Sequence, residues 1–346
     1  MTLLINYRPV LREPTGIGVY AQGVLPALER LPHVLIPGGE RGTPLQRLRR
    51  LVWTQSHLPR LALRHRASLV FTPAPEGYLG PQAVPQVVMV HDLRPITHPE
   101  ASMQSLYFRS WVPPLLRSCR GIITNSQFTA REIERTAAVP PERIAVIPLG
   151  YDTGRFQPAP SRSPATHPYL LHVGQAYPHK NVVRLLEAFA ALAPQHPELR
   201  LLLAGKPHAR HTPWLQARAK ALGLQQRVDF LPYVPLAELP DLYRGALALV
   251  YPSLWEGFGL PVLEAMACGT PVITSVGSAL DELASGAALQ VDPFDTQALA
   301  AAMGRVVDDQ ACRQRLQRLG LERAARYTWA TVGAETARVL EGLAGA

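Results

Sequence analysis

Short apolar runs typical of buried strands alternate with helical stretches along almost the whole chain. Four such runs occur in the first half and five in the second. They are residues 3–6, 68–71, 86–90 and 121–124, followed by 169–173, 200–204, 227–230, 246–250 and 271–274. Continuous apolar strands separated by helices predict parallel sheets that are covered on both faces.

The rhythm of strands and helices stops at a Pro- and Ser-rich stretch, residues 152–168, and then restarts. A chain of 346 residues is long for one domain and sufficient for two. We therefore predict two Rossmann-like α/β domains, residues 1–160 and 161–326, which face each other across a central cleft. Beyond about Asp308 the pattern is helical, and the last segment, 327–346, forms a separate terminal helix.

The composition favours a folded protein, because 47% of the residues are hydrophobic and only 18% are charged. Three widely separated cysteines lack the spacing of a zinc site, which indicates reduced thiols in a cytoplasmic protein. The apolar run at the N-terminus is brief and ends at Arg8, so we expect no signal peptide. No apolar run approaches the roughly 20 residues of a membrane span.

Nearly all of the net charge of +9 lies in the first half of the chain. Residues 1–150 contain 17 arginines and nine acidic residues, whereas residues 151–346 contain 18 basic and 17 acidic residues. Arginine and leucine alternate irregularly between Arg41 and Arg66, which predicts an amphipathic helix in peripheral contact with an anionic membrane surface. The alternatives are an Arg-rich solvated face and, less in keeping with the rest of the chain, a nucleic-acid contact.

The segment from Ser253 to Val272 predicts a loop, a two-turn helix, a turn and a buried strand. Pro261 can open the helix, and Gly269 can close it in a left-handed conformation. The helix start offers free N–H groups and the positive end of a dipole, which suit a phosphate. Glu256 and Glu264 flank this phosphate site, and Glu264 is placed to accept hydrogen bonds from sugar hydroxyls. The structural alternative is a buried helix of any α/β protein.

This segment resembles the Glu-x7-Glu signature of the retaining glycosyltransferases of family 4 (glycosyl transferases group 1), which include bacterial mannosyltransferases. The resemblance implies the GT-B fold, with a last helix that crosses back to the N-terminal domain. It also implies roles for several residues in binding the donor. Glu256 contacts the transferred sugar, the amides of Phe258, Gly259 and Leu260 contact its phosphate, Glu264 contacts the ribose, and the segment with Tyr233 and Val234 borders the base.

Lys180 is one of only three lysines in a chain that otherwise uses arginine. It follows Gly174 at the end of a predicted strand and precedes a helix, where a diphosphate would lie. The family has a lysine at the matching position that contacts the donor diphosphate. Two arginines that are usual nearby are replaced here by Gln175 and His179, which leaves two alternatives: the leaving group is held less strongly, or Arg210 or another basic side chain compensates. The alternative is a solvated lysine at a helix start.

Two features of the first half complete the predicted site. Gly16 and Gly18 follow the first strand and open a helix, and they resemble the glycine loop that approaches the donor phosphate in the family. His91 ends a buried strand, at the place where the family has a histidine near the transferred sugar. We expect His91 to orient the sugar by a hydrogen bond, and the adjacent Asp92 to position the loop.

No Asp-x-Asp pair occurs in the sequence, so we predict that the leaving group is stabilised without a metal ion or other cofactor. The predicted activity is retaining transfer of a hexose from a nucleotide-diphosphate sugar, GDP-mannose before UDP-sugars, to a saccharide or lipid-linked acceptor. Such a reaction belongs to cell-envelope polysaccharide or glycolipid synthesis, in the cytoplasm or at the inner face of the membrane. The alternatives are an epimerase or a non-catalytic sugar-nucleotide-binding protein of the same fold.

Overall fold

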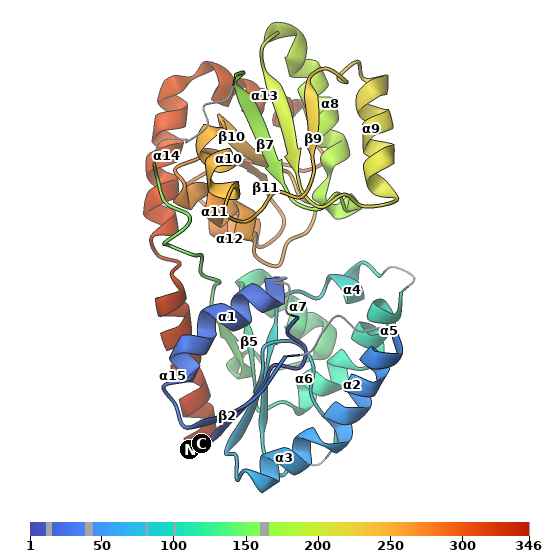
Figure 1. The fold of residues 1–346 in the computed structure, drawn as a ribbon, viewed down its shortest axis with the longest axis vertical. Coiled ribbons are helices and arrows are strands. Elements are labelled where there is room, and N and C mark those ends of the chain that lie inside the picture. Colours follow the sequence, from blue (N-terminus) through green and yellow to red (C-terminus); the bar gives the residue numbers. More distant parts are fainter. Residues whose placement is uncertain (12–15, 39–43, 81, 100–101, 160–165, 346) are drawn as a thin grey trace. The chain divides into compact units, whose positions relative to one another are not determined.

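The computed structural model describes residues 1–11, 16–38, 44–80, 82–99, 102–159 and 166–345, apart from the side chains of Pro44, Leu45 and Arg47. Its internal contacts divide the chain into two compact units (Figure 1). Unit 1 comprises Met1–Gly150 together with Thr328–Ala346, and unit 2 comprises Tyr151–Tyr327. Each unit contains one six-stranded parallel sheet, as the alternation of apolar runs and helical stretches predicts.

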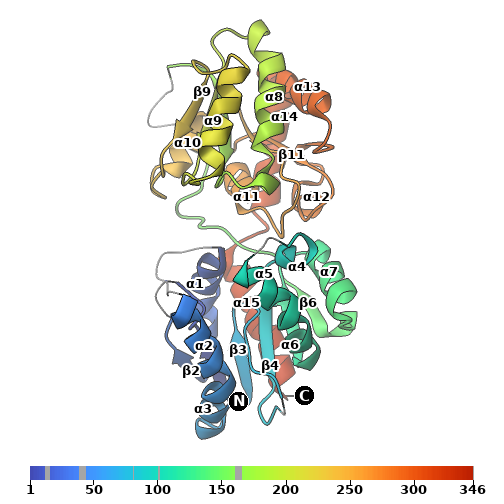
Figure 2. The same cartoon turned by 90° about the vertical axis from the view of Figure 1, so that its right-hand side faces the viewer.

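The sheet of unit 1 has the strand order β2-β1-β3-β4-β5-β6. Helices lie on both sides of this sheet, as Figure 2 shows. The strands are β1 (Leu3–Asn6), β2 (His33–Ile36), β3 (Leu69–Thr72), β4 (Gln86–Val90), β5 (Gly121–Thr124) and β6 (Ile144–Val146). The helices are α1 (Gly16–Leu28), α2 (Pro44–Ser56), α3 (Leu58–Arg64), α4 (Arg94–Thr97), α5 (Met103–Ser110), α6 (Val112–Ser118), α7 (Gln127–Ala137), η1 (Pro141–Arg143) and α15 (Trp329–Gly345).

The sheet of unit 2 has the strand order β12-β11-β10-β7-β8-β9. Its core is formed mainly by leucine, valine and alanine side chains of the central strands and of α8, α9 and α13. The strands are β7 (Tyr169–Val173), β8 (Arg200–Ala204), β9 (Val228–Leu231), β10 (Ala248–Tyr251), β11 (Val272–Ser275) and β12 (Leu289–Val291). The helices are η2 (Pro178–Lys180), α8 (Val182–Leu192), η3 (Ala193–Gln195), α9 (His211–Ala221), α10 (Leu239–Gly245), α11 (Leu260–Ala267), α12 (Leu280–Ala284), α13 (Thr296–Asp308) and α14 (Gln310–Ala324).

Two details differ from the sequence-based expectation. The strands β2, β6 and β12 were not predicted; each lies at an edge of its sheet and is only partly buried. The helical pattern of residues 103–117 forms two helices rather than one, because the chain breaks at Trp111 between α5 and α6. Pro113 explains the break, because a proline cannot donate to the preceding turn and its ring crowds the carbonyl four residues earlier.

The last helix, α15, returns to unit 1 and packs against α1, which confirms the predicted crossover. The two helices approach closely because glycines lie at the contact. A Cβ atom on Gly333 would lie 2.8 Å from the Cβ of Ala27, and one on Gly23 would collide with the ring of Trp329. The Trp329 ring also meets Tyr20 of α1 edge-on, with 6.4 Å between the ring centres.

Each sheet has one point where the connections change direction. In unit 1 this point lies between β1 and β3, and in unit 2 it lies between β7 and β10. Ligands of open α/β sheets bind outside the carboxyl ends of the strands at such switch points. A ligand site is therefore expected at the carboxyl ends of these four strands, and the polar side chains there are the first candidates for it.

Candidate functional site

The Glu-x7-Glu segment has the local structure that its sequence predicts. After β10 the chain forms a loop, and α11 begins at Leu260 with Pro261 in its first turn. Gly259 has φ +108°, and a Cβ there would lie 2.6 Å from the Leu280 side chain, so only glycine suits this position. Gly269 ends the helix at φ +76°, and buried strand β11 follows. The amides of Phe258, Gly259 and Leu260 donate to no acceptor among the described residues.

Lys180 and Glu256 meet at the switch point of unit 2. Nζ of Lys180 donates to Oε1 of Glu256 at 2.6 Å and to the hydroxyl of Tyr251 at 2.7 Å. The side chains of Lys180 and Glu256 are only 15% and 12% exposed. The structure thus brings together two of the predicted catalytic residues, which come from the loops after the neighbouring strands β7 and β10.

The ion pair keeps both groups charged near neutral pH. Burial alone would lower the pKa of Lys180, but Glu256 and Tyr251 outweigh that effect, so the pKa is raised. Burial would likewise raise the pKa of Glu256, but the adjacent Lys180 outweighs it, and the pKa is lowered. The two shifts agree in sign with one strong ion pair.

The backbone around Lys180 is held by Asn181, the residue that precedes α8. Asn181 adopts a left-handed conformation with φ +57°. Its side-chain amide donates to the carbonyl oxygens of Pro252 at 3.1 Å and Pro293 at 2.8 Å. The first bond connects the lysine loop to the loop after β10 and the second connects it to the loop after β12. The first explains how side chains 76 positions apart in sequence remain in contact.

Glu264 also lies in unit 2, near the middle of α11. Its Oε2 accepts a hydrogen bond of 2.9 Å from the hydroxyl of Tyr243 on α10. Burial is the main reason that the pKa of Glu264 is raised from 4.5 to about 7. Burial thus favours the protonated form of the second carboxylate of the signature, and one of its oxygens already has a partner.

A cavity of about 390 Å³ lies at the carboxyl ends of β7, β8 and β9. Its walls include Gly174, Gly205, Phe230, Leu231 and the first turns of α9. The loops close tightly here, because a Cβ on Gly205 would collide with the carbonyl of Gly174. Of the predicted base-binding segment, Leu231 and Pro232 line the cavity, whereas the side chain of Tyr233 is 65% exposed and Val234 is only partly buried.

Phe258 has a structural contact as well as its predicted amide. Its side chain is 6% exposed and its ring packs edge-on against Tyr327, with 6.1 Å between the ring centres. The side chain therefore anchors the loop from within, and only its backbone is available to a ligand.

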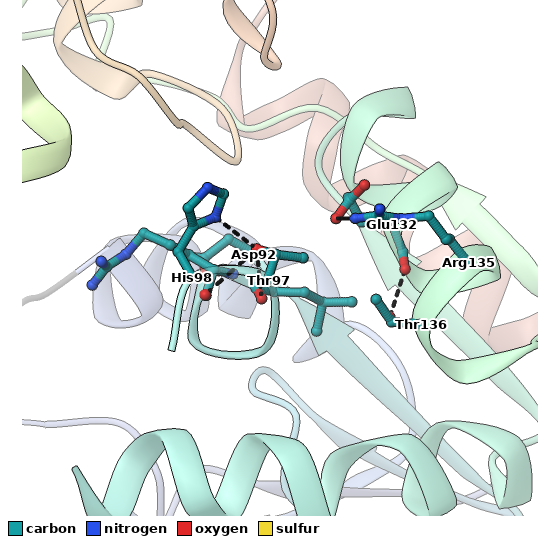
Figure 3. A network of polar contacts seen from close by, with 8 residues as sticks. Asp92, Thr97, His98, Glu132, Arg135 and Thr136 are labelled. Carbon is teal, nitrogen blue, oxygen red and sulfur yellow. Dashed lines mark hydrogen bonds and ion pairs between the residues drawn. The ribbon is translucent and has the colours of Figure 1, made fainter. Parts of the chain in front are cut away.

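The predicted residues of the first half lie in unit 1. His91 follows β4, and its Nε2 lies 3.1 Å from the carbonyl oxygen of Pro73. Because a carbonyl only accepts, Nε2 carries the hydrogen and Nδ1 presents a lone pair. Burial lowers the pKa of His91 to about 4, so the ring is neutral at pH 7. The adjacent Asp92 accepts the amide of Arg94 at 3.0 Å in the turn that Figure 3 shows with Thr97 and His98.

Gly16 begins α1, as the glycine loop predicts, and it is exposed with open space where a Cβ would be. Gly18 is buried in the same helix. Thr15, the first residue of that motif, lies outside the described residues.

Two residues next to Lys180 were missed by the sequence analysis. Tyr251 ends β10, and His172 lies in β7 two residues before Gly174. Their rings stack with 5.6 Å between centres, and Nδ1 of His172 donates to the carbonyl of Val250 at 3.0 Å. Both are polar groups inside apolar strand runs, near the carboxyl ends. Their position near the strand ends is the signal in the sequence that could have identified them as site residues.

No group of three or more histidine, cysteine, aspartate or glutamate side chains in the described ranges is arranged to hold a metal ion. Within the same ranges, no helix has both the length and the apolar character needed to cross a membrane.

Comparison with known proteins gives matches over most of the chain. Residues 155–323 match the family model for glycosyl transferases group 1, and residues 16–155 match the model for glycosyltransferase family 4. The O-antigen chain mannosyltransferase B of Escherichia coli is 32% identical over 76% of this chain and 71% of its own length. The O-antigen chain mannosyltransferase RfbU of Salmonella typhimurium is 33% identical over 64% of this chain and 60% of its own length.

Two solved structures have a similar fold over the whole chain. The sucrose-phosphate synthase of Thermosynechococcus elongatus matches with a TM-score of 0.81 and 20% identity, covering 99% of both chains. Anabaena HepE, solved in complex with UDP-glucose, matches with a TM-score of 0.79 and 20% identity, covering 99% of this chain and 100% of its own. At such identities the likeness establishes the fold alone.

Proposed function

This chain belongs to the group 1 glycosyltransferases of family 4 and is a hexosyltransferase, and from that premise we propose that it transfers mannose from GDP-mannose to a saccharide or lipid-linked acceptor. The two O-antigen mannosyltransferases support the choice of sugar. They also support a place in cell-envelope polysaccharide or glycolipid synthesis. We propose that the reaction takes place in the cytoplasm or at the inner face of the membrane. Other nucleotide-diphosphate sugars, UDP-sugars first among them, are the second choice of donor.

The observation that carries the proposal is the position of Lys180 Nζ between Glu256 and Tyr251, at the β7/β10 switch point. A departing nucleoside diphosphate gains negative charge as the bond to the sugar breaks. A fixed ammonium group stabilises that charge without reorganisation at the moment of reaction. Lys180 is charged before the donor binds, because Glu256 and Tyr251 raise its pKa.

The donor would change the partners of this ion pair. Its diphosphate takes over part of the Lys180 ammonium, and an oxygen of Glu256 is then available to a hydroxyl of the transferred sugar. In the proposed arrangement the free amides of Phe258, Gly259 and Leu260 bind a phosphate. Glu264 binds the ribose through the oxygen that Tyr243 leaves free, and Gly174 and the cavity next to it admit the nucleotide near Tyr233 and Val234.

We further propose that the configuration at the anomeric carbon is retained, without an enzyme nucleophile, as the family resemblance implies. The backbone of Gly16 and Gly18 approaches the donor phosphate in this proposal. The neutral ring of His91 orients the sugar by accepting a hydrogen bond at Nδ1. Its lowered pKa makes it a poor base but leaves it an acceptor at physiological pH.

The direct test incubates the protein with GDP-mannose and candidate acceptors, and measures released GDP and the new glycoside. We expect GDP release to depend on the acceptor, and the product to keep the anomeric configuration of the donor in its NMR spectrum. An epimerase would alter the sugar without forming a glycoside, and a non-catalytic binding protein would leave the donor intact. Stabilisation against heat by GDP and by UDP, compared at equal concentration, identifies the base.

A further inference from the structure

Unit 1 has its own charged cluster at the β1/β3 switch point, which none of the predicted roles uses. Arg8 follows β1, and Glu76 lies in the loop after β3, the strand that pairs directly with β1. Arg50 and Trp53 reach the same place from α2. We call these four residues the Arg8 cluster. In sheets with this strand order the switch point is where a ligand binds.

Glu76 holds one of the two arginines. Its residue is 5% exposed, and Oε2 lies 3.0 Å from Nη2 of Arg50. Oε1 of Glu76 also accepts from the hydroxyl of Thr54 at 3.4 Å. Burial raises the pKa of Glu76, and the charges of Arg50 and, to a smaller extent, Arg8 oppose that rise. Arg50 is the direct partner of Glu76, and this ion pair fixes the loop after β3 to helix α2.

Arg8 makes no direct ion pair of this kind, although its charge lies close enough to Glu76 to favour the ionised carboxylate. Its guanidinium carbon lies 4.2 Å above the centre of the Trp53 ring, which holds the flat group in place. The Arg8 amide is fixed by Oδ1 of Asn6 at 3.3 Å. Among the described residues the guanidinium makes no hydrogen bond and no ion pair, and its Nε is buried without a partner. The cluster thus contains two guanidinium groups and one carboxylate. The guanidinium of Arg8, which makes no direct ion pair, is held in place by Trp53.

We propose that the Arg8 cluster binds an anionic group, a phosphate or a carboxylate, on the saccharide acceptor of the transferase reaction. The inference rests on the proposed function, since it assigns the acceptor to unit 1. A guanidinium offers two parallel N–H donors that match either anion. The indole of Trp53 fixes the plane of the fork, and Arg50, held by Glu76, contributes a second guanidinium to the cluster.

The test measures binding of three probes of similar size to protein saturated with GDP, so that the diphosphate site is occupied. The probes are glucose 6-phosphate, glucuronate and uncharged methyl glucoside. Isothermal titration calorimetry measures the binding of each probe. We expect at least one of the two anions to bind about tenfold or more tightly than methyl glucoside, and the favoured anion shows whether phosphate or carboxylate is recognised. Equal binding of all three probes would overturn the proposal.

Variants connect the preference to Arg8. Arg8→Gln should abolish the preference for the anion while leaving methyl glucoside unaffected, and Arg8→Lys should restore only part of it, since lysine lacks the fork. Arg49→Gln is the matched control, because Arg49 is an exposed neighbour on α2 that carries the same charge. The proposal fails if Arg8→Gln keeps the preference, or if Arg49→Gln loses it equally. A purely structural role of Arg8 would lower the melting temperature without changing this preference.

The same experiments separate this inference from the proposed function. Release of GDP from GDP-mannose, measured with uncharged acceptors, tests the transferase without the Arg8 cluster. Transfer only to uncharged acceptors would contradict the anion site and support the proposed transferase. An Arg8-dependent preference for the anion, without any use of a nucleotide-sugar, would support the anion site and contradict the proposed transferase.

Discussion

The hydroxyl of Tyr251 accepts a hydrogen bond of 2.7 Å from Nζ of Lys180, and the same nitrogen donates to Glu256 on its other side. The phenol thus fixes the ammonium by a neutral contact, which would remain if a ligand displaced the carboxylate as proposed. Tyr251→Phe keeps the ring and its stacking with His172 but removes this contact.

We expect Tyr251→Phe to lower kcat by roughly tenfold, because one hydrogen bond to a charged group contributes about 1.5–3 kcal/mol. Steady-state kinetics with the preferred donor measure the change. Tyr169→Phe is the control, since its hydroxyl donates to the carbonyl of Leu242 at the opposite end of β7. It should lower stability and leave kcat unchanged; equal loss of kcat in the two variants would argue against a positioning role for Tyr251.

Lys180→Ala should reduce kcat by a hundredfold or more, since preorganised groups that stabilise developing charge contribute about 3–4 kcal/mol. The variant should remain folded by circular dichroism. Lys220→Ala, which removes an exposed lysine of α9, should behave like the wild type. Near-normal turnover of Lys180→Ala would mean that another basic residue stabilises the leaving group.

The buried carboxyl of Glu264 should make stability fall as pH rises. Its pKa in the folded protein is raised to about 7, above the usual 4.5. The folded state therefore keeps a proton that the unfolded chain has lost, and the stabilisation present below pH 4.5 disappears as the pH rises through about 7.

The side chain of the Glu264→Gln variant cannot ionise, so the variant should not lose stability in this way as the pH rises. The melting temperature of the variant minus that of the wild type should rise between pH 5 and 7.5, in the absence of nucleotide. Glu142→Gln, at an exposed carboxylate, should give a difference that does not change with pH. A constant difference for Glu264→Gln would contradict the raised pKa.

The region between Arg41 and Arg66 should bind anionic vesicles. Arg41 and the side chain of Arg47 lie outside the described part of the structure, and Arg50 is paired with Glu76. Exposed apolar side chains remain on α2 and α3, namely Leu48 at 57%, Val52 at 60% and Leu63 at 55%. Each nearby arginine contributes about 1 kcal/mol at an anionic surface, and the effect weakens with salt.

Co-sedimentation with phosphatidylserine vesicles at low and high salt measures this binding. The double substitution Arg60→Gln and Arg64→Gln should weaken it several-fold, whereas Arg315→Gln on α14 of unit 2 should not. A protein that ignores these vesicles at low salt would have a merely solvated basic face.

Activity should survive EDTA. The chain has no Asp-x-Asp pair, and Lys180 and the amides at the start of α11 can take the place of a cation on the diphosphate. Initial rates with and without EDTA, and after addition of Mg²⁺ or Mn²⁺, decide the question. Strict dependence on an added cation would show that the diphosphate itself recruits a metal.

Local patterns were sufficient for the elements that are buried or capped by special residues. The central strands could be read from their apolar runs, and α11 from Pro261 and Gly269, since these signals act over a few neighbouring residues. The edge strands β2, β6 and β12 could not, because their half-exposed positions need the rest of the sheet to define them.

The sequence by itself determined the two-sheet architecture, the family and the identity of Lys180, Glu256 and Glu264 as candidates, because each depends on residue types at short spacing. Only the tertiary structure decided their partners. Tyr251 beside Lys180, Tyr243 beside Glu264, and an Arg8 that lies on Trp53 while Glu76 takes Arg50 are contacts between distant segments. Such contacts arise when parallel strands bring their carboxyl ends to one edge of a sheet, and no local spacing records them.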